Sequence, residues 1–132
     1  MRTDINFNEG YDSREYGYSQ GILVKNISET LYISGQVGIH HAHEERSFEE
    51  QIELAYENLE KVLKASGMNF YNVVKVTELV VGNNLDRLNA VNAKKKKLFN
   101  IFPASLYIPV DSLALPGMLF EIEAVAVKFS ND

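Results

Sequence analysis

Hydrophobic residues recur at helical spacing in the middle of the chain and predict its clearest element. Ser47, followed three residues later by Glu50, has the form of a capping box, in which each side chain satisfies a backbone donor of the other residue. Gly67 supplies a C-terminal stop. Between these signals the apolar positions recur every three or four residues: Phe48, Ile52, Ala55, Leu59, Val62 and Leu63. We therefore expect a helix between Ser47 and Gly67.

The remaining periodicity predicts a second helix and five strands. The helix is expected over 85–98, with four inward residues: Leu85, Leu88, Val91 and Leu98. Runs typical of strands occupy 72–81, 105–110 and 120–129, and shorter ones occupy 22–24 and 31–33. The turn sequence Asn26-Ile-Ser-Glu predicts that the two short strands form a hairpin. Pro109 requires its strand to lie at a sheet edge or to contain a bulge.

The order of elements, ββαβαββ, predicts a single α+β domain over residues 1–132, with 1–19 as an ordered loop or short edge segment. Two-layer packing places both helices on one face of a mixed sheet. The last strand is apolar on both of its faces. The face without helices must therefore be covered in another way, and self-association is the simplest one.

Composition limits the classes of function. The chain has 132 residues, 45% hydrophobic, and no cysteine, so it forms neither a disulfide framework nor a thiolate metal site. No apolar run approaches the roughly 20 residues that span a bilayer, and the N-terminus is too polar for a secretory signal. We expect a cytoplasmic protein with no membrane partner. The net charge of −5 disfavours a nucleic-acid partner.

Two carboxylates stand out in the last strand. Glu121 and Glu123 are two residues apart, so both side chains point to the same face of the sheet. A charged residue that faces a core is costly unless something pairs with it. The pair of glutamates is therefore a candidate for chemistry.

Several separated segments point together to one protein family: Tyr18-Ser-Gln, Ser34-Gly-Gln, Asn72-Val-Val-Lys-Val-Thr, Phe102-Pro-Ala and Glu121-Ile-Glu-Ala. From about Tyr18 to Lys128 the chain resembles the Rid family, the small YjgF-type proteins whose best-known members hydrolyse reactive enamines and imines. The resemblance implies a chorismate-mutase-like two-layer sandwich that assembles as a homotrimer, with sheets lining a central barrel, ligand sites between subunits, and no cofactor.

The resemblance also implies site residues. Positions matching Tyr18, Ser34, Asn92 and Glu121 line the intersubunit cleft in catalytic members. Glu121 would position or deprotonate the water that attacks an imine carbon, and the others would hold the ligand through hydrogen bonds. The alternative for Glu121 is a structural glutamate paired with a backbone donor or with Lys75.

Ser105 is the main departure from the family pattern, because catalytic members have there the arginine that binds the substrate carboxylate. A serine hydroxyl in place of a bidentate guanidinium forfeits about 1.5–3 kcal/mol or more of binding. The usual deaminase activity is therefore in doubt. Arg14, four residues before Tyr18, is a candidate replacement that would lean over the cleft; the alternative is an exposed surface arginine.

Two further clusters invite functional interpretations. His40, His41 and His43 lie in a polar connector with no evident supporting ligands, so we expect no physiological metal site. The run 94–97 consists of four lysines, which cover a full helical turn and cannot all face one ligand. A solvated helix face is the preferred interpretation of this run, ahead of an RNA-binding patch.

The sequence thus predicts a Rid-family protein that binds a small metabolite in an intersubunit cleft and hydrolyses an imine, an enamine or a related substrate. The alternative is a trimer that binds a metabolite without turnover or has a regulatory role. RNA cleavage or translation inhibition rests only on labels used for some family members, and the net charge disfavours it.

Overall fold

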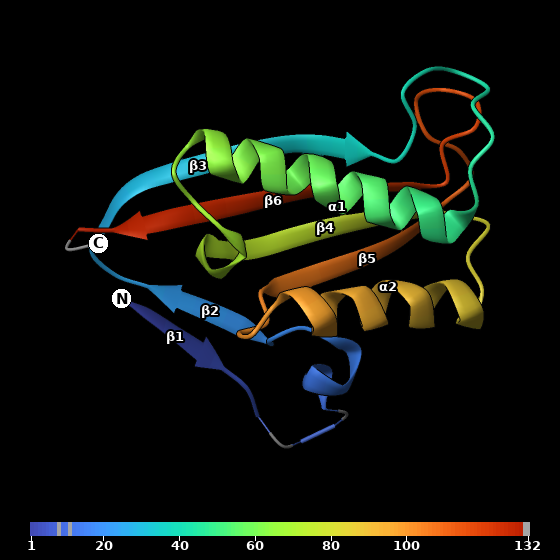
Figure 1. The fold of residues 1–132 in the computed structure, drawn as a ribbon. Coiled ribbons are helices and arrows are strands. Elements are labelled where there is room, and N and C mark those ends of the chain that lie inside the picture. Colours follow the sequence, from blue (N-terminus) through green and yellow to red (C-terminus); the bar gives the residue numbers. More distant parts are fainter. Residues whose placement is uncertain (8, 11, 131–132) are drawn as a thin grey trace.

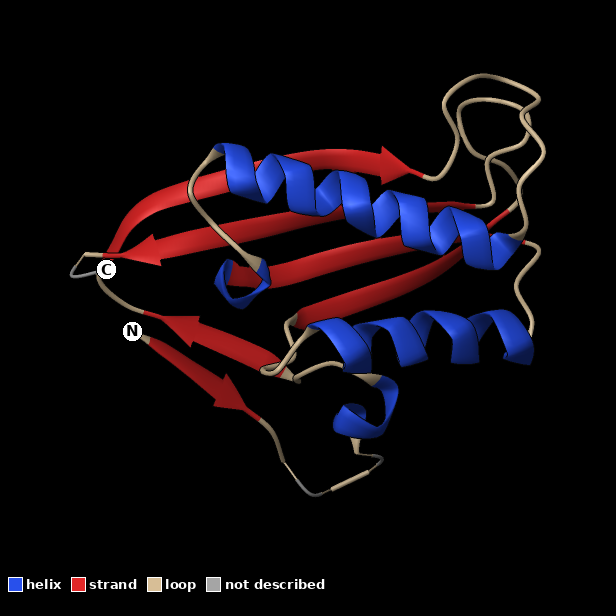
Figure 2. Cartoon of the chain, in the orientation of Figure 1, coloured by secondary structure: helices blue, strands red, loops and turns tan. Residues whose placement is uncertain are grey.

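In the computed structural model of the protein, which describes residues 1–7, 9–10 and 12–130, four strands form one mixed sheet (Figure 1). Their order is β3-β6-β4-β5, with β4 and β5 parallel and the other two pairs antiparallel. The strands are β3 (Ile27–Val37), β4 (Val73–Val81), β5 (Ala104–Val110) and β6 (Phe120–Phe129). Helices α1 (Phe48–Ala65) and α2 (Leu85–Leu98) lie on the same side of this sheet (Figure 2). The predicted α+β two-layer architecture is confirmed.

The N-terminal strands form a separate small sheet, so the predicted hairpin is wrong. β2 (Gly21–Val24) pairs with β1 (Arg2–Ile5), whereas β3 pairs with β6. β3 already begins at Ile27, and the residues that look like a turn in the sequence form its first part. Arg2 holds β1 against the main sheet, because its guanidinium donates hydrogen bonds to the carbonyls of Tyr71 (2.8 Å) and Val73 (2.9 Å).

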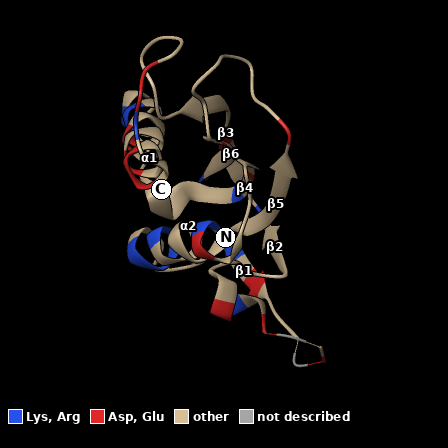
Figure 3. Cartoon of the chain, turned by 90° about the vertical axis from the view of Figure 1, so that its right-hand side faces the viewer, with Lys and Arg blue, Asp and Glu red and all other residues tan. Residues whose placement is uncertain are grey.

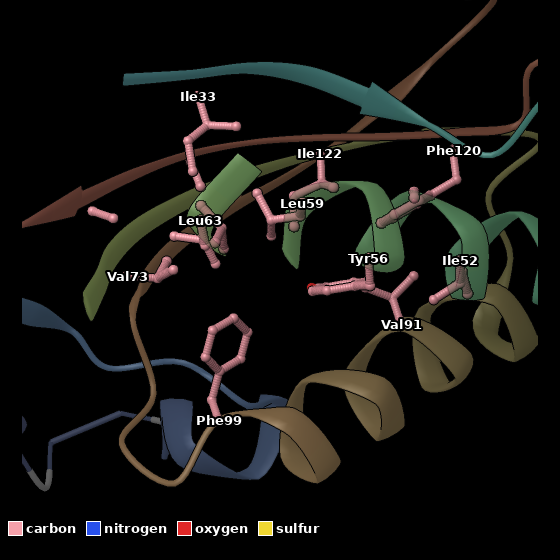
Figure 4. Close-up of a cluster of buried hydrophobic side chains, with 14 of the residues drawn as sticks. Ile33, Ile52, Tyr56, Leu59, Leu63, Val73, Val91, Phe99, Phe120 and Ile122 are labelled. Carbon is pink, nitrogen blue, oxygen red and sulfur yellow. The ribbon is translucent and has the colours of Figure 1, made fainter. Parts of the chain in front are cut away.

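Helix α1 forms as its sequence predicts. Ser47 and Glu50 make both hydrogen bonds of the capping box, and Gly67 adopts a left-handed conformation with φ 68° just beyond the C-terminal cap. The inward face of α1 packs on the sheet together with residues from the strands and α2 (Figure 4). Tyr56 and Phe120 stack at its centre, with ring centroids 6.2 Å apart.

Helix α2 agrees with the prediction in its bounds but not in all of its inward residues. Val91 is fully buried, and Leu88 is partly buried. Leu85, however, is 71% exposed, so its predicted inward position is wrong. It lies in the first helical turn, directly after the exposed residues 82–84, where no neighbouring element covers it in the described part of the chain.

The second face of the sheet is open, because none of the described helices lies on it (Figure 3). Tyr32 of β3 and Leu106 of β5 are 79% and 50% exposed. Pro109 lies on β5, the edge strand of the sheet, as its missing N–H requires. No described helix is long and apolar enough to span a membrane.

Candidate functional site

A pocket of about 460 Å³ lies between α2, β5 and the segment around η1 (Ser13–Tyr16), a short 3₁₀ helix. Tyrosines and leucines provide most of its wall: it is lined by Tyr16, Tyr18, Leu88, Asn92, Lys95, Ser105, Leu106 and Tyr107. Three of the predicted ligand-binding residues, Tyr18, Asn92 and Ser105, therefore lie in one pocket although they come from three separate segments.

The loop that holds Tyr18 is fixed on both sides. Gly17, in a left-handed conformation with φ 76°, turns the chain so closely over α2 that a Cβ atom there would lie 3.2 Å from Cβ of Lys95. On the other side, the hydroxyl of Ser19 donates a hydrogen bond of 2.7 Å to the carbonyl of Phe102, just before β5. The backbone thus positions the Tyr18 ring between α2 and β5.

A buried ion pair lies beneath the pocket, with Lys95 in the pocket wall and Glu78 behind it. The Nζ atom of Lys95 lies 3.0 Å from Oε1 of Glu78, a β4 residue, and the two side chains are only 2% and 0% exposed. Ser105 joins them: its hydroxyl donates to the same Oε1 at 2.9 Å and accepts from Nζ at 3.2 Å. Nζ also lies 5.5 Å from the centroid of the Tyr18 ring. The single charged side chain of the pocket wall is therefore neutralised from within the chain.

Burial dominates the electrostatics of this region. Desolvation raises the pKa of Glu78, while the charge and hydrogen bond of Lys95 and the hydrogen bond of Ser105 oppose the rise. Desolvation raises the pKa of Tyr107 to about 12, and the nearby Glu78 charge adds to the rise. Within the described part of the chain, Oε2 of Glu78 and the buried hydroxyl of Tyr56 have no hydrogen-bond partner. Of the two carboxylate oxygens of Glu78, Oε1 is therefore hydrogen-bonded by Lys95 and Ser105, whereas Oε2 has no partner among the described residues.

Lys95 was missed by the sequence analysis, and the prediction that the run 94–97 is a solvated face is wrong for this residue. Lys94 reaches across to α1, where its Nζ lies 2.8 Å from Oε2 of Glu53, and residues 96 and 97 are exposed. Lysine and arginine positions, coloured blue in Figure 3, make up much of α2. The position of Lys95 along the helix could have predicted its burial. Lys95 follows the buried Val91 by four residues and therefore lies on the same face of α2.

Glu121 and Ser34 lie away from this pocket. The buried residues Phe120 and Ile122 face the helices, so Glu121 points to the open face of the sheet, as strand alternation predicts. A Cβ atom at Gly35 would come within 2.5 Å of Oε2 of Glu121, so the glycine makes room for this carboxylate. The exposed Ser34 adjoins it on β3. One chain alone does not bring these two residues to the pocket.

Lys75 and Arg14 do not supply the contacts that were considered for them within the described residues. No ion pair joins Glu121 to Lys75, which stands opposite Val125 in the sheet. Arg14 forms an exposed ion pair with Asp12, with Nε 3.0 Å from Oδ1, and its side chain is not part of the pocket wall. Arg14 is thus engaged at the surface beside the pocket.

The histidine segment forms no group of three metal-ligating side chains among the described residues. Nε2 of His41 lies 3.4 Å from Oε1 of Glu44, whose other oxygen contacts Arg46. The Arg46 contact lowers the pKa of Glu44. Glu44 thus forms an ion pair with Arg46 and lies beside the His41 ring within the connector before α1.

Comparisons with known proteins agree on one family. The model of the family described as "Endoribonuclease L-PSP" matches residues 13–128. A human protein named 2-iminobutanoate/2-iminopropanoate deaminase is 39% identical over 116 residues, which cover 84% of this chain and 80% of the human protein. A RutC family protein of Aquifex aeolicus is 32% identical over 114 residues, covering 84% of this chain and 88% of that protein.

A solved structure shares nearly the whole fold. It is the crystal structure of a protein of unknown function of the conserved Rid protein family, YyfB from Yersinia pestis. The TM-score is 0.87 at 30% sequence identity, and the match covers 96% of this chain and 98% of that one. The similarity therefore includes the N-terminal strands as well as the main sheet.

Proposed function

Because the chain belongs to the Rid (YjgF-type) family, we propose that it binds a small polar metabolite in a cleft between two copies of the chain and hydrolyses an imine or enamine there. The observation that carries the proposal is the pocket in which Tyr18, Asn92 and Ser105 meet. The names of the curated relatives support the reaction class, since the human relative is named as an imine deaminase.

Self-association would complete the site. Glu121 and Ser34 lie on the open face of the sheet, whereas the pocket lies on the helix side, at the edge strand β5. A neighbouring copy that docks by its open face would both cover exposed apolar side chains such as Tyr32 and bring its Glu121 towards the pocket edge. A homotrimer satisfies this requirement with one type of interface.

The proposed reaction needs few groups. The imine carbon is already electrophilic, so Glu121 accepts a proton from a water molecule whose oxygen attacks that carbon. That proton then passes to the nitrogen and gives a carbinolamine. The proton of its hydroxyl group follows to the nitrogen as the C–N bond breaks, so that ammonia or an amine leaves and a carbonyl compound remains. An enamine would first take up a proton on carbon to give the same iminium centre. Tyr18 and Asn92 would orient the substrate by hydrogen bonds.

The decisive experiment compares Glu121→Gln with Glu123→Gln. Both residues lie on the open face of β6, and Glu123 is the more exposed of the two. The assay measures carbonyl release from imines that are generated in situ by an oxidase. We expect a loss of about a hundredfold or more in the rate for Glu121→Gln and little change for Glu123→Gln.

Other results of this experiment would contradict parts of the proposal. Equal rates for both variants would show that Glu121 has no catalytic role. Ligand binding without turnover in the native protein would favour a metabolite-binding or regulatory trimer. Cleavage of RNA by protein freed of contaminating nuclease would be needed to support the family description as an endoribonuclease for this chain.

The intersubunit part is tested separately by Tyr32→Glu. This change places a charge on the open face without touching the pocket. We expect the sedimentation coefficient to fall to that of a monomer and turnover to fall with it. A native protein that sediments as a monomer would remove the shared cleft altogether.

A further inference from the structure

The pocket described above contains a cation that is already paired with a carboxylate of the same chain. Lys95 is the only charged side chain among the residues that line it, and Lys95 is held by Glu78 at 3.0 Å. The other polar groups of the wall are neutral: the hydroxyls of Tyr16, Tyr18, Tyr107 and Ser105, and the amide of Asn92. Within one chain, a ligand in this pocket therefore meets no available positive charge.

The groups around Glu78 leave no second cation for a ligand. Tyr56 approaches it from α1, Lys95 from α2, and Ser105 and Tyr107 from β5. The charge of Arg87 reaches Tyr107, but its guanidinium donates to the carbonyl of Val81 and lies 4.8 Å from the centroid of the Phe48 ring. An anion at Lys95 would consequently stand beside a buried carboxylate, with no charge to compensate it.

We propose that Glu78 makes this pocket selective for uncharged ligands, because its carboxylate takes the place at Lys95 that the carboxylate of an imino acid would otherwise occupy. This inference rests on the proposed function and specifies its substrate class: imines, enamines or carbonyl compounds without an acid group. The human relative is named for 2-iminobutanoate and 2-iminopropanoate, which are carboxylates. The present chain would thus share the reaction type but not the charge of the substrate.

Glu78 acts here as a positioning residue, since it does not line the pocket itself. It fixes the Nζ atom of Lys95 and cancels its charge. Replacing Glu78 by glutamine keeps the shape of the side chain and can keep both hydrogen bonds through the amide oxygen, but it releases the charge of Lys95. The pocket then gains the one feature that an anionic ligand requires.

The test measures the binding of pyruvate and pyruvamide, two ligands of nearly equal shape that differ in charge, by titration calorimetry or NMR. The native protein should bind pyruvamide at least about tenfold more tightly than pyruvate, because the pyruvate carboxylate would lose its hydration beside Glu78 without a free cation to pair with. In Glu78→Gln the order should reverse. In the neutral double variant Glu78→Gln/Lys95→Met the native order should return, which separates charge from any general loosening of the fold.

Two outcomes would overturn the inference: tighter binding of pyruvate by the native protein, or the same order of the two ligands in native protein and Glu78→Gln. The first comparison needs no variant, so a failure of Glu78→Gln to fold leaves the inference testable. The proposed function fails differently. Binding in the expected order without hydrolysis of any imine would refute the proposed catalysis but leave the proposed selectivity intact. Fast hydrolysis of imino acids would refute the selectivity but support the catalysis.

Discussion

Replacing Lys95 by methionine should destabilise the protein through one defined cause, the loss of charge compensation for Glu78. Methionine is unbranched and of similar length, so it fills most of the same space. It removes the ammonium group that lies 3.0 Å from Oε1 of a fully buried carboxylate. Nothing else in the described surroundings carries a charge to replace it, because the remaining neighbours are the hydroxyls of Ser105, Tyr56 and Tyr107.

The size of the effect follows from two limits. Removing one partner of a buried ion pair typically costs about 3–5 kcal/mol. The folded variant can, however, protonate Glu78 instead of burying an unpaired charge. From the reference pKa of 4.5, this protonation costs about 3.4 kcal/mol at neutral pH, at roughly 1.4 kcal/mol per pH unit. We therefore expect a loss of about 3 kcal/mol in the free energy of unfolding at neutral pH.

The loss should depend on pH in a predictable direction. In the variant the folded-state pKa of Glu78 lies above its unfolded value of 4.5, so the folded state binds more protons between these two values. The stabilising contribution of the protonated form is complete below 4.5 and is lost as the pH rises through the folded-state pKa. The loss in the free energy of unfolding caused by Lys95→Met should accordingly shrink to less than about 1 kcal/mol in acid, where Glu78 is protonated in both the folded and the unfolded state.

Urea unfolding at a fixed protein concentration, at neutral pH and again near the reference pKa of Glu78, measures this effect. The matched control is the double variant Lys95→Met/Glu78→Gln, which has no buried charge and should lie within about 1 kcal/mol of the native protein or above it. A cost of Lys95→Met that stays the same at both pH values, or a double variant that loses the sum of the two single effects, would refute this account of the ion pair.

Three further predictions concern neighbouring parts of the molecule. Ser105→Arg should lose stability but bind pyruvate by calorimetry more tightly than the native protein does, because it adds a second cation to one buried carboxylate; in Ser105→Arg/Lys95→Met a single cation again faces Glu78, and this gain in binding should disappear. Gly38→Ala should lose about 3 kcal/mol or more in urea unfolding, since its Cβ would lie 2.3 Å from the Gln51 backbone, whereas Gly21→Ala, with no atom closer than 3.9 Å, should be nearly neutral. Absorbance titration should show a phenol with a pKa of about 12 that is missing in Tyr107→Phe, and a titration curve unchanged by that substitution would argue against its burial beside Glu78.

The fold was largely predictable because its signals are local. The capping box at Ser47 and the left-handed glycine after α1 act within a few residues, and strand alternation places Glu121 correctly. Strand pairing depends on distant residues, and the hairpin predicted from the local turn sequence was therefore wrong. Asn26 does adopt the left-handed conformation of a turn, with φ 60°, but the two strands beside it pair with β1 and β6 instead of with each other. Turn chemistry indicates where a chain bends and not which strands then meet.

Ser105 shows why a site cannot be judged one position at a time. From the sequence alone, a small neutral residue at position 105, where the family resemblance leads one to expect a guanidinium, indicates that the pocket contains no cation. In the structure the place is filled: Nζ of Lys95 lies 3.2 Å from the Ser105 hydroxyl and enters from α2 instead of β5. The serine is then the residue that leaves room for the lysine, and an arginine there would compete with it for Glu78. From its position on α2, the Lys95 ammonium also reaches the carboxylate of Glu78. Ser105, Lys95 and Glu78 therefore form one unit, which gives this pocket an internal ion pair and no free cation.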